Sequence, residues 1–224
     1  MFDLIELAWA VSPYTIVGEG NVSKRVDSGL LVKASGAELR TMSEKDTVLC
    51  DLDGKQLDRF DKKPSIEVCF HAWFMRTFEG ANYVAHTHPV QTNKILCSNH
   101  ITEFATTRLF PDQVVRNGAK SCVVPYATPG GKLLDAIEKS VKDFMDREFY
   151  FPKLILLQNH GIIVASTSVK ECIASTMMCE KSAEIYLGAK SLGIKPLSKE
   201  CVMDIDSDPK EKYRRDLLNE SNLC

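Results

Sequence analysis

The sequence predicts a mixed α/β sandwich, and three observations lead to this fold class. Short apolar stretches bounded by turn residues recur along the chain, as is typical of strands. Longer stretches with a helical period lie among them. The Gly-rich phosphate motif of a doubly wound nucleotide-binding fold is absent. With 224 residues, of which 44% are hydrophobic and 26% charged, the chain suits one compact domain over residues 1–224.

The first part of the chain predicts a helix, a hairpin and a second helix. Asp27-Ser28-Gly29 joins two apolar runs and is a hairpin signal. Ser65 is the expected N-cap of the second helix, because periodic apolar residues follow it. The expected elements are a helix over 2–10, a turn over 18–21, strands over 22–26 and 30–33, a loop over 34–37, a strand over 46–51, a tight turn over 53–54 and a helix from 65 onward.

The second part of the chain alternates strands and helices. A rigid loop is expected where two prolines and two glycines flank Tyr126. The expected elements are a strand over 82–88, helices over 90–97 and 132–147, a strand over 121–124, paired strands over 154–157 and 161–165, and a long helix over 169–187. We expect the last twenty-odd residues, which are polar, to be irregular.

Composition excludes several classes of function. The formal net charge is -2 and charges of both signs are mixed, so neither a nucleic-acid-binding stripe nor a polybasic membrane anchor is present. No apolar run is long enough to span a bilayer, and acidic residues interrupt the N-terminal apolar stretch, unlike a signal peptide. The eight cysteines form no Cys-x-x-Cys pair. Buried free thiols in a reducing cytoplasm are therefore favoured over disulfides, and cysteine ligation of zinc lacks a paired spacing.

Three of the five histidines suggest a metal site. His86 and His88 are one residue apart on a predicted strand, so both imidazoles point to the same face. His160 follows another apolar, strand-like run. Three imidazoles with one open position are typical of a catalytic zinc. An isolated His-x-His pair is a weak signal by itself, and the remaining histidines, His71 and His100, are expected to be structural.

Several other residues suit a catalytic or anion-binding role. Glu67 is the candidate acid/base in the first turn of a predicted helix, and the competing interpretation is a solvated surface carboxylate. Tyr126 could deliver a proton from its rigid loop, although a packing tyrosine is commoner. Small polar residues at turns suit an anion such as phosphate; they occur in Gly20-Asn21-Val22-Ser23, Ala34-Ser35-Gly36 and Pro64-Ser65.

Taken in this order, these pieces resemble the class II aldolase/adducin head family, which includes fuculose-phosphate and rhamnulose-phosphate aldolases and ribulose-phosphate 4-epimerase. The resemblance runs from about Gly18 to about Leu187. It implies a three-layer α/β/α sandwich around a largely antiparallel central sheet. It also implies a zinc-dependent homotetramer with active sites between subunits, although another divalent metal could replace zinc. Its most specific motifs are His86-Thr87-His88, Gln158-Asn159-His160-Gly161, Gly20-Asn21-Val22-Ser23 and Pro125-Tyr126-Ala127-Thr128-Pro129-Gly130.

The resemblance also assigns roles to individual residues. The metal ligands would be His86, His88 and His160, and Glu67 would take the acid/base position. Tyr126 matches a tyrosine that acts across the subunit interface in the aldolases. The phosphate-binding positions are occupied by Asn21, Ser35, Gly36 and Ser65. One position departs from the sugar-phosphate aldolases, because Ile66 stands where a second serine is usual, and this puts phosphate binding in question.

The implied activity is that of a carbon–carbon lyase of carbohydrate metabolism. It would cleave a small ketose phosphate or related hydroxy-carbonyl compound by retro-aldol chemistry through a metal-stabilised enediolate. Related epimerases tend to carry Asp at the position of Glu67, so this residue favours cleavage. The alternatives are a sugar-phosphate 4-epimerase, a methylthioribulose-phosphate dehydratase and a non-enzymatic module like the adducin head. Retention of all three histidines argues against the non-enzymatic module.

Overall fold

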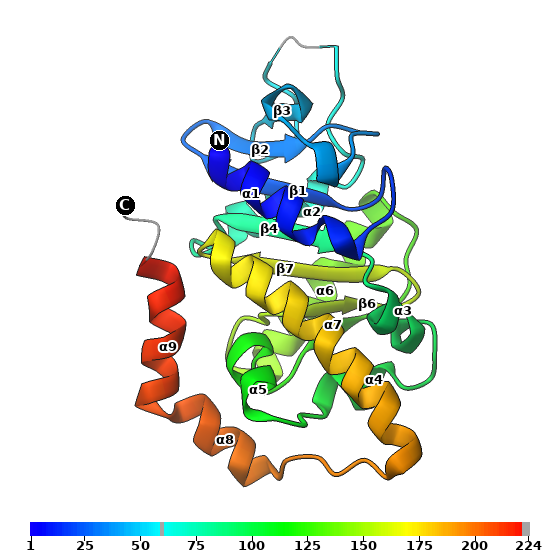
Figure 1. Ribbon diagram of the computed structural model, residues 1–224. Helices are drawn as coiled ribbons and strands as arrows, with labels where there is room; N and C mark the ends of the chain where they lie inside the picture. The colour runs from blue at the N-terminus through cyan, green and yellow to red at the C-terminus, as the bar shows by residue number, and fades with distance from the viewer. Residues whose placement is uncertain (59–60, 221–224) are drawn as a thin grey trace.

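The computed structural model describes residues 1–58 and 61–220, and Figure 1 shows their arrangement. Within these residues seven strands form one sheet in the order β3-β2-β1-β4-β7-β6-β5. Every neighbouring pair in this sheet is antiparallel except β5 and β6, which run parallel. The strands are β1 Asn21–Val26, β2 Gly29–Lys33, β3 Thr47–Cys50, β4 Tyr83–Thr87, β5 Cys122–Val124, β6 Ile155–Leu157 and β7 Gly161–Ser166.

Helices cover both faces of the sheet, so the predicted three-layer α/β/α sandwich with a largely antiparallel sheet is confirmed. Helices α1 and α7 cross one face and α2 and α6 cover the other (Figure 1). The helices are α1 Phe2–Val11, α2 Val68–Thr77, α3 Val90–Leu96, α4 Ile101–Thr106, α5 Pro111–Asn117, α6 Gly131–Glu148, α7 Val169–Leu192, α8 Lys199–Ser207 and α9 Pro209–Glu220, with short 3₁₀ turns η1 Ser12–Tyr14, η2 Leu39–Thr41 and η3 Glu44–Asp46.

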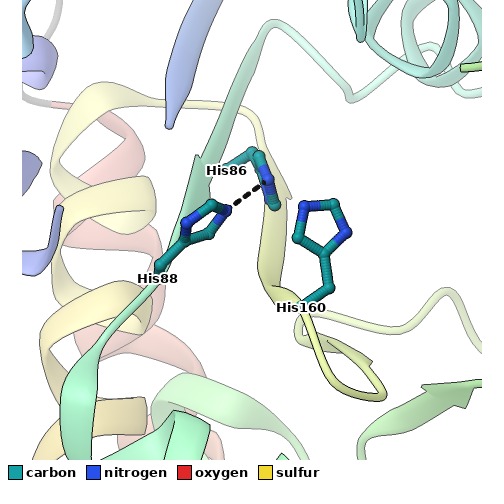
Figure 2. A group of neighbouring side chains, drawn as sticks. All are labelled: His86, His88 and His160. Carbon is teal, nitrogen blue, oxygen red and sulfur yellow. Dashed lines mark hydrogen bonds between the residues drawn. The ribbon is translucent and has the colours of Figure 1, made fainter. Parts of the chain in front are cut away.

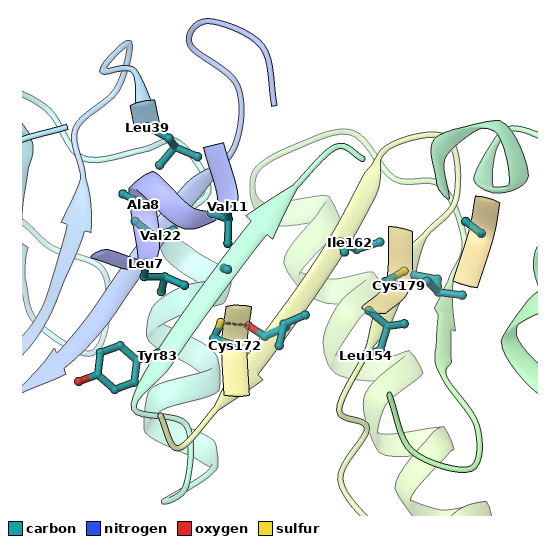
Figure 3. Close-up of a cluster of buried hydrophobic side chains, with 14 of the residues drawn as sticks. Leu7, Ala8, Val11, Val22, Leu39, Tyr83, Leu154, Ile162, Cys172 and Cys179 are labelled. Atoms are coloured by element: carbon teal, nitrogen blue, oxygen red, sulfur yellow. Dashed lines mark hydrogen bonds between the residues drawn. The ribbon is translucent and has the colours of Figure 1, made fainter. Parts of the chain in front are cut away.

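The alternation of side chains along β1 and β4 creates an apolar face and a face that carries the polar site. Val22 of β1 and Ala85 of β4 point into the cluster under α1 and α7, part of which is drawn in Figure 3. Asn21 lies directly opposite His86 in the antiparallel ladder. Because neighbours in a strand point to opposite faces, Asn21 and His86 face the α2 layer. The ring of Phe70 in α2 meets the edge of the His86 ring at a centroid distance of 5.6 Å.

The structure corrects the predicted start of the second helix. Helix α2 begins at Val68, and Glu67 rather than Ser65 occupies its N-cap position. The Ser65 hydroxyl instead accepts hydrogen bonds from the Glu67 backbone N–H at 3.3 Å and from Asn21 at 3.1 Å. The backbone N–H of Val68 donates to the Ser65 carbonyl at 3.0 Å. A separate turn therefore precedes the helix and turns Glu67 toward the sheet.

The prediction of an irregular C-terminal tail is wrong, because α8 and α9 are helices. The Ser198 hydroxyl accepts the backbone N–H of Cys201 at 3.2 Å and caps α8. Pro209 begins α9, where a proline costs no hydrogen bond. A polar composition does not prevent helix formation, and α9 is rich in lysine, glutamate and arginine, which are good helix formers. The two short helices α4 and α5 were also not predicted.

The described cysteines are free thiols, and Cys224 lies outside the described residues. Burial raises the pKa of Cys122, Cys172 and Cys179 to about 12, so these thiols are inert packing groups. Among the described residues, no helix combines the length and the apolar character needed to cross a membrane.

Candidate metal centre

The end of β4 presents two imidazoles to one point. His86 is fully buried, and its Nδ1 lies 2.9 Å from the carbonyl oxygen of Ile162 in β7. A carbonyl can only accept, so Nδ1 carries the proton and the Nε2 lone pair is left for another partner. His88, just beyond the strand, places its Nε2 3.0 Å from His86 Nε2. Figure 2 shows these two rings facing each other.

The turn between β6 and β7 delivers the third imidazole. Asn159 adopts a left-handed conformation with φ of 56°, which asparagine tolerates better than most residues. The turn is fixed to α3 from both sides: the N–H of Asn159 donates to the Leu96 carbonyl at 3.1 Å, and the Asn93 amide donates to the His160 carbonyl at 3.1 Å. The His160 ring centroid lies 4.8 Å from that of His86 (Figure 2).

Gly161 allows this turn to approach β4 closely. A Cβ atom at this position would lie 2.5 Å from Cδ2 of His88 and closer still to the backbone carbonyl oxygen of Thr87. Any side chain here would therefore push the turn away from the two histidines of β4. This explains in physical terms why a glycine directly follows His160.

The three-histidine group could bind a divalent metal ion. One ring nitrogen from each of His86, His88 and His160 lies within 4.8 Å of the others. Burial lowers the pKa of His86 well below its usual range and also lowers that of His160, and the nearby His88 ring contributes to both shifts. The rings of His86 and His160 are therefore neutral, as metal ligands must be. Three imidazoles fit the donor set of a catalytic metal ion with an open position.

Glu67 lies beside this group and is buried, with its side chain 9% exposed. Its Oε2 lies 3.4 Å from His86 Nε2 and its Oε1 lies 3.5 Å from His160 Nε2. Oε1 has no hydrogen-bond partner among the described residues. Glu67 is therefore not the solvated surface carboxylate that was the competing interpretation, although its acid/base role remains a prediction.

A chain of buried polar groups holds Glu67 in place. Ser23 and Asn21 contact the two ring nitrogens of His71, with Ser23 Oγ 2.6 Å from Nδ1 and Asn21 Oδ1 against Nε2. Because the Asn21 oxygen accepts from His71, its NH₂ group faces the other way and donates to Glu67 Oε2 at 2.9 Å. Burial lowers the pKa of His71 well below its usual range. His71 is structural, as predicted, but it also orients the carboxylate through Asn21.

The proposed phosphate-binding positions fall into one neighbourhood through backbone pairing. An isolated bridge joins Ala34 to Pro64, and the Ser35 N–H donates to the Lys63 carbonyl at 2.8 Å. The Ser65 N–H donates to the Lys33 carbonyl at 3.1 Å. The loop that contains Ser35 and Gly36 therefore runs beside Ser65, which Asn21 contacts directly. The Ile66 side chain is 70% exposed next to this group.

Lys33 is a member of this neighbourhood that sequence reasoning missed. It is almost completely buried, and its Nζ donates to the Ala37 carbonyl at 2.6 Å across the Ser35–Gly36 turn. Burial lowers its pKa, whereas Glu67 and Asp46 raise it. A lysine at the end of a strand is normally expected to be solvated. Only the folded structure shows that the Lys33 side chain is buried and lies near the candidate site.

A comparison with family models matches residues 8–187 to the class II aldolase and adducin N-terminal domain. The chain belongs to this family. The matched region includes the three histidines, Glu67 and the polar loops described above.

Relatives of this aldolase-family chain act on phosphorylated substrates, as their names state. The chain is 24% identical over 195 residues to the 3-oxo-tetronate 4-phosphate decarboxylase of Haemophilus influenzae, covering 87% of this chain and 89% of that protein. It is 29% identical over 176 residues to the L-fuculose phosphate aldolase of the same organism, covering 78% and 75% respectively. The crystal structure of YgbL from Klebsiella pneumoniae matches with a TM-score of 0.78 and 24% identity over 91% of this chain and 96% of that one, which supports the fold.

Tyr126, the candidate interfacial tyrosine of this aldolase-family chain, is not part of the cluster within one subunit. It lies after β5 and its side chain is 59% exposed. Within the described residues no hydrogen bond or ring contact joins Tyr126 to the three histidines or Glu67. Its predicted action across a subunit interface remains a prediction.

Proposed function

We propose that this chain is a zinc-dependent aldolase that cleaves a small ketose phosphate, or a closely related hydroxy-carbonyl compound, between two carbons. The observation that carries the proposal is the three-histidine group beside a buried carboxylate. His86 and His160 lie 3.4 and 3.5 Å from Glu67, whose Oε1 has no hydrogen-bond partner among the described residues. Family membership and the phosphorylated substrates named for the relatives support it. Retention of the whole histidine set argues against a non-enzymatic module.

His86, His88 and His160 would hold the metal ion, whose contribution when bound is to polarise the substrate carbonyl. Neutral nitrogen ligands with an adjacent carboxylate suit zinc, although other divalent metals accept the same set. The hydrogen bond from His86 to the Ile162 carbonyl keeps its other nitrogen free for this purpose.

Glu67 would transfer the proton at the carbon next to the carbonyl. Oε2 is held by Asn21, so the unpartnered Oε1 is the oxygen available to the substrate. A positioned carboxylate in a buried site is an effective acid/base group. Tyr126 would serve the aldehyde side from a neighbouring subunit, which its exposed position permits, in a homotetramer with sites between subunits.

The polar loops would hold the phosphate group of the substrate. Asn21, Ser65 and the Ser35–Gly36 turn supply hydrogen-bond donors, and the buried cation of Lys33 lies behind that turn. An anion close to a buried cation gains more from charge attraction than it would in water. Attraction between Lys33 and the phosphate would therefore offset the hydrogen bond that is lost because Ile66 has no hydroxyl.

Decarboxylation of a 3-oxo acid phosphate is the second candidate, because a decarboxylase is among the relatives that align over most of the chain. Both reactions break a carbon–carbon bond and leave the electron pair on the carbon next to a carbonyl. In an aldolase the other product is an aldehyde, and in a decarboxylase it is CO₂. The same residues could serve either reaction, so the two candidates are distinguished by the product that is released.

The test is a screen of ketose 1-phosphates, their unphosphorylated forms and 3-oxo acid phosphates, with aldehyde and CO₂ measured separately. Aldehyde release from a ketose phosphate, abolished by a chelator and restored by zinc, supports the aldolase. A 4-epimerase would give a stereoisomer and a dehydratase would release water, in both cases without aldehyde. Release of CO₂ alone would overturn the aldolase assignment in favour of the decarboxylase.

A further inference from the structure

Glu19 is a carboxylate near the histidines to which neither the family resemblance nor the proposed function assigns a role. It lies between η1 and β1, and its Oε2 is 3.3 Å from His88 Nδ1. Both side chains are partly buried, His88 at 19% exposure and Glu19 at 36%. The contact therefore lies at the edge of the metal centre, where solvent weakens it only in part.

The loop that carries Glu19 is fixed by two reciprocal hydrogen bonds. The Glu19 N–H donates to the Ile16 carbonyl at 3.0 Å, and the Ile16 N–H donates back to Glu19 Oε2 at 3.2 Å. The next residue, Gly20, has a positive φ, and a Cβ there would lie 2.8 Å from the His86 carbonyl oxygen. The His88 N–H also donates to the Tyr14 carbonyl at 2.9 Å. The backbone of this loop thus holds the Glu19 carboxylate against β4.

The orientation of the His88 ring determines which of its nitrogens lies beside Glu19. Nε2 of His88 faces His86, whereas Nδ1 faces Glu19. Without a metal ion, the 3.0 Å contact between the two Nε2 atoms needs a proton on His88 Nε2, because His86 carries its proton on Nδ1. When a metal ion takes the Nε2 lone pair, the His88 proton has to lie on Nδ1, which faces the Glu19 carboxylate, and a carboxylate can accept it. The lone pair of Nε2 then points into the three-histidine group, which is the form that a metal ion requires.

The three histidines differ in the partner of Nδ1, the ring nitrogen that would not bind the metal ion. His86 donates to the Ile162 carbonyl. His160 Nδ1 is buried with no hydrogen-bond partner among the described residues. Among the described residues, His88 alone has a carboxylate beside the ring nitrogen that points away from the group. A negative partner at that nitrogen makes an imidazole a stronger donor to a metal than a neutral partner does.

We propose that Glu19 is a positioning residue that favours the Nδ1–H form of His88, strengthens this ring as a ligand and thereby raises the metal affinity of the centre. The inference rests on the proposed metal site but not on the substrate or the reaction. It assigns to this loop a role distinct from that of Asn21 two residues later, which contacts Glu67.

The experiment compares Glu19→Ala and Glu19→Gln with the unaltered protein. The zinc dissociation constant is measured by competition with a chromogenic chelator. We expect Glu19→Ala to bind zinc about 10–100-fold more weakly, as is typical for loss of such a partner. Glu19→Gln should lose less, because its amide oxygen can take the place of the carboxylate oxygen beside His88 Nδ1 and can still accept from the Ile16 N–H. Asp27→Asn, which removes one exposed charge in the β1–β2 turn, is the matched control and should leave zinc affinity unchanged.

A second readout separates positioning from simple loop damage. In metal-free protein with ¹⁵N-labelled histidine, the ring nitrogen shifts report which nitrogen carries the proton, and His88→Ala assigns the signal. We expect the fraction of His88 in the Nδ1–H form to be higher in the unaltered protein than in Glu19→Ala, because the Glu19 carboxylate lies beside Nδ1.

Unchanged zinc affinity in both Glu19 variants would overturn the proposal. Weaker zinc binding with an unchanged His88 tautomer would also overturn it, because the loss would then come from the loop. These outcomes are independent of catalysis. If the protein binds zinc but cleaves none of the substrates, the proposed function fails while the role of Glu19 stands.

Discussion

The replacement Gly161→Ala tests whether the histidine cluster depends on the close approach of the β6–β7 turn to β4. The added methyl would overlap the Thr87 carbonyl oxygen and lie 2.5 Å from the His88 ring. A backbone carbonyl cannot rotate away as a side chain can, so the cost should be near the upper end of the usual 1–3 kcal/mol for overpacking. A loss of about 3 kcal/mol corresponds to a decrease of about 6–12 °C in Tm for a chain of this size.

The control for this prediction is Gly188→Ala in α7, where a Cβ would meet no atom within 4 Å. Alanine is the better helix former by about 0.5–1 kcal/mol, so this variant should melt slightly higher. Thermal unfolding followed by circular dichroism gives both values, and chelator competition gives zinc affinity. Gly161→Ala should also bind zinc more weakly, because the His88 ring is displaced. The steric account is refuted if Gly161→Ala melts and binds zinc like the unaltered protein.

Three further predictions concern catalysis, the anion pocket and pH. Glu67→Gln should keep the fold and much of the metal but reduce turnover by about 10²–10⁴-fold, because an amide cannot accept the proton; near-normal turnover on the true substrate would remove Glu67 from the acid/base role. Ile66→Ser should lower the inhibition constant of a phosphorylated enediolate mimic by at least about tenfold, since a hydrogen bond to a charged group contributes about 1.5–3 kcal/mol. If neither form is inhibited by the mimic or by phosphate, the assignment of a phosphate pocket is wrong. In metal-free protein, burial holds the pKa of His71 and His86 below the unfolded value of about 6.5. Below that pH the unfolded chain therefore binds more protons than the folded chain. The contribution of each histidine to the free energy of unfolding is fully present above about pH 6.5. It decreases as pH falls, by up to about 1.4 kcal/mol per pH unit for each histidine. Urea unfolding between pH 7 and 5 should show this slope, and His71→Asn should make it shallower; a flat profile would contradict the buried neutral rings.

Much of the site could be predicted because its signals are local. The alternation of side chains along the predicted strand indicates that His86 and His88 point to the same side. The only difference is that β4 ends at Thr87, one residue before His88. The apolar run before His160 predicts the strand that delivers this residue, and β6 Ile155–Leu157 confirms it. Such signals need only a few neighbouring residues.

The parts that were missed depend on packing between distant segments. The burial of Lys33 follows from the Ala34–Pro64 bridge, and the pairing of Ser23 with His71 follows from how α2 lies on β1. Neither appears in the residue pattern. The helix start was misplaced because the Ser65 hydroxyl serves a turn and Asn21 instead of a helix end. Helices α4 and α5 are too short for their period to be clear, having six and seven residues.

The zinc content of purified protein, compared with that of His86→Ala and His160→Ala, tests the central claim most directly. The account predicts about one zinc ion per chain in the unaltered protein and a large loss in both variants. His100→Ala is the control, because His100 lies on the surface with Glu103 and Lys190 and should keep its zinc. Undiminished zinc in both His86→Ala and His160→Ala would contradict the three-histidine metal centre.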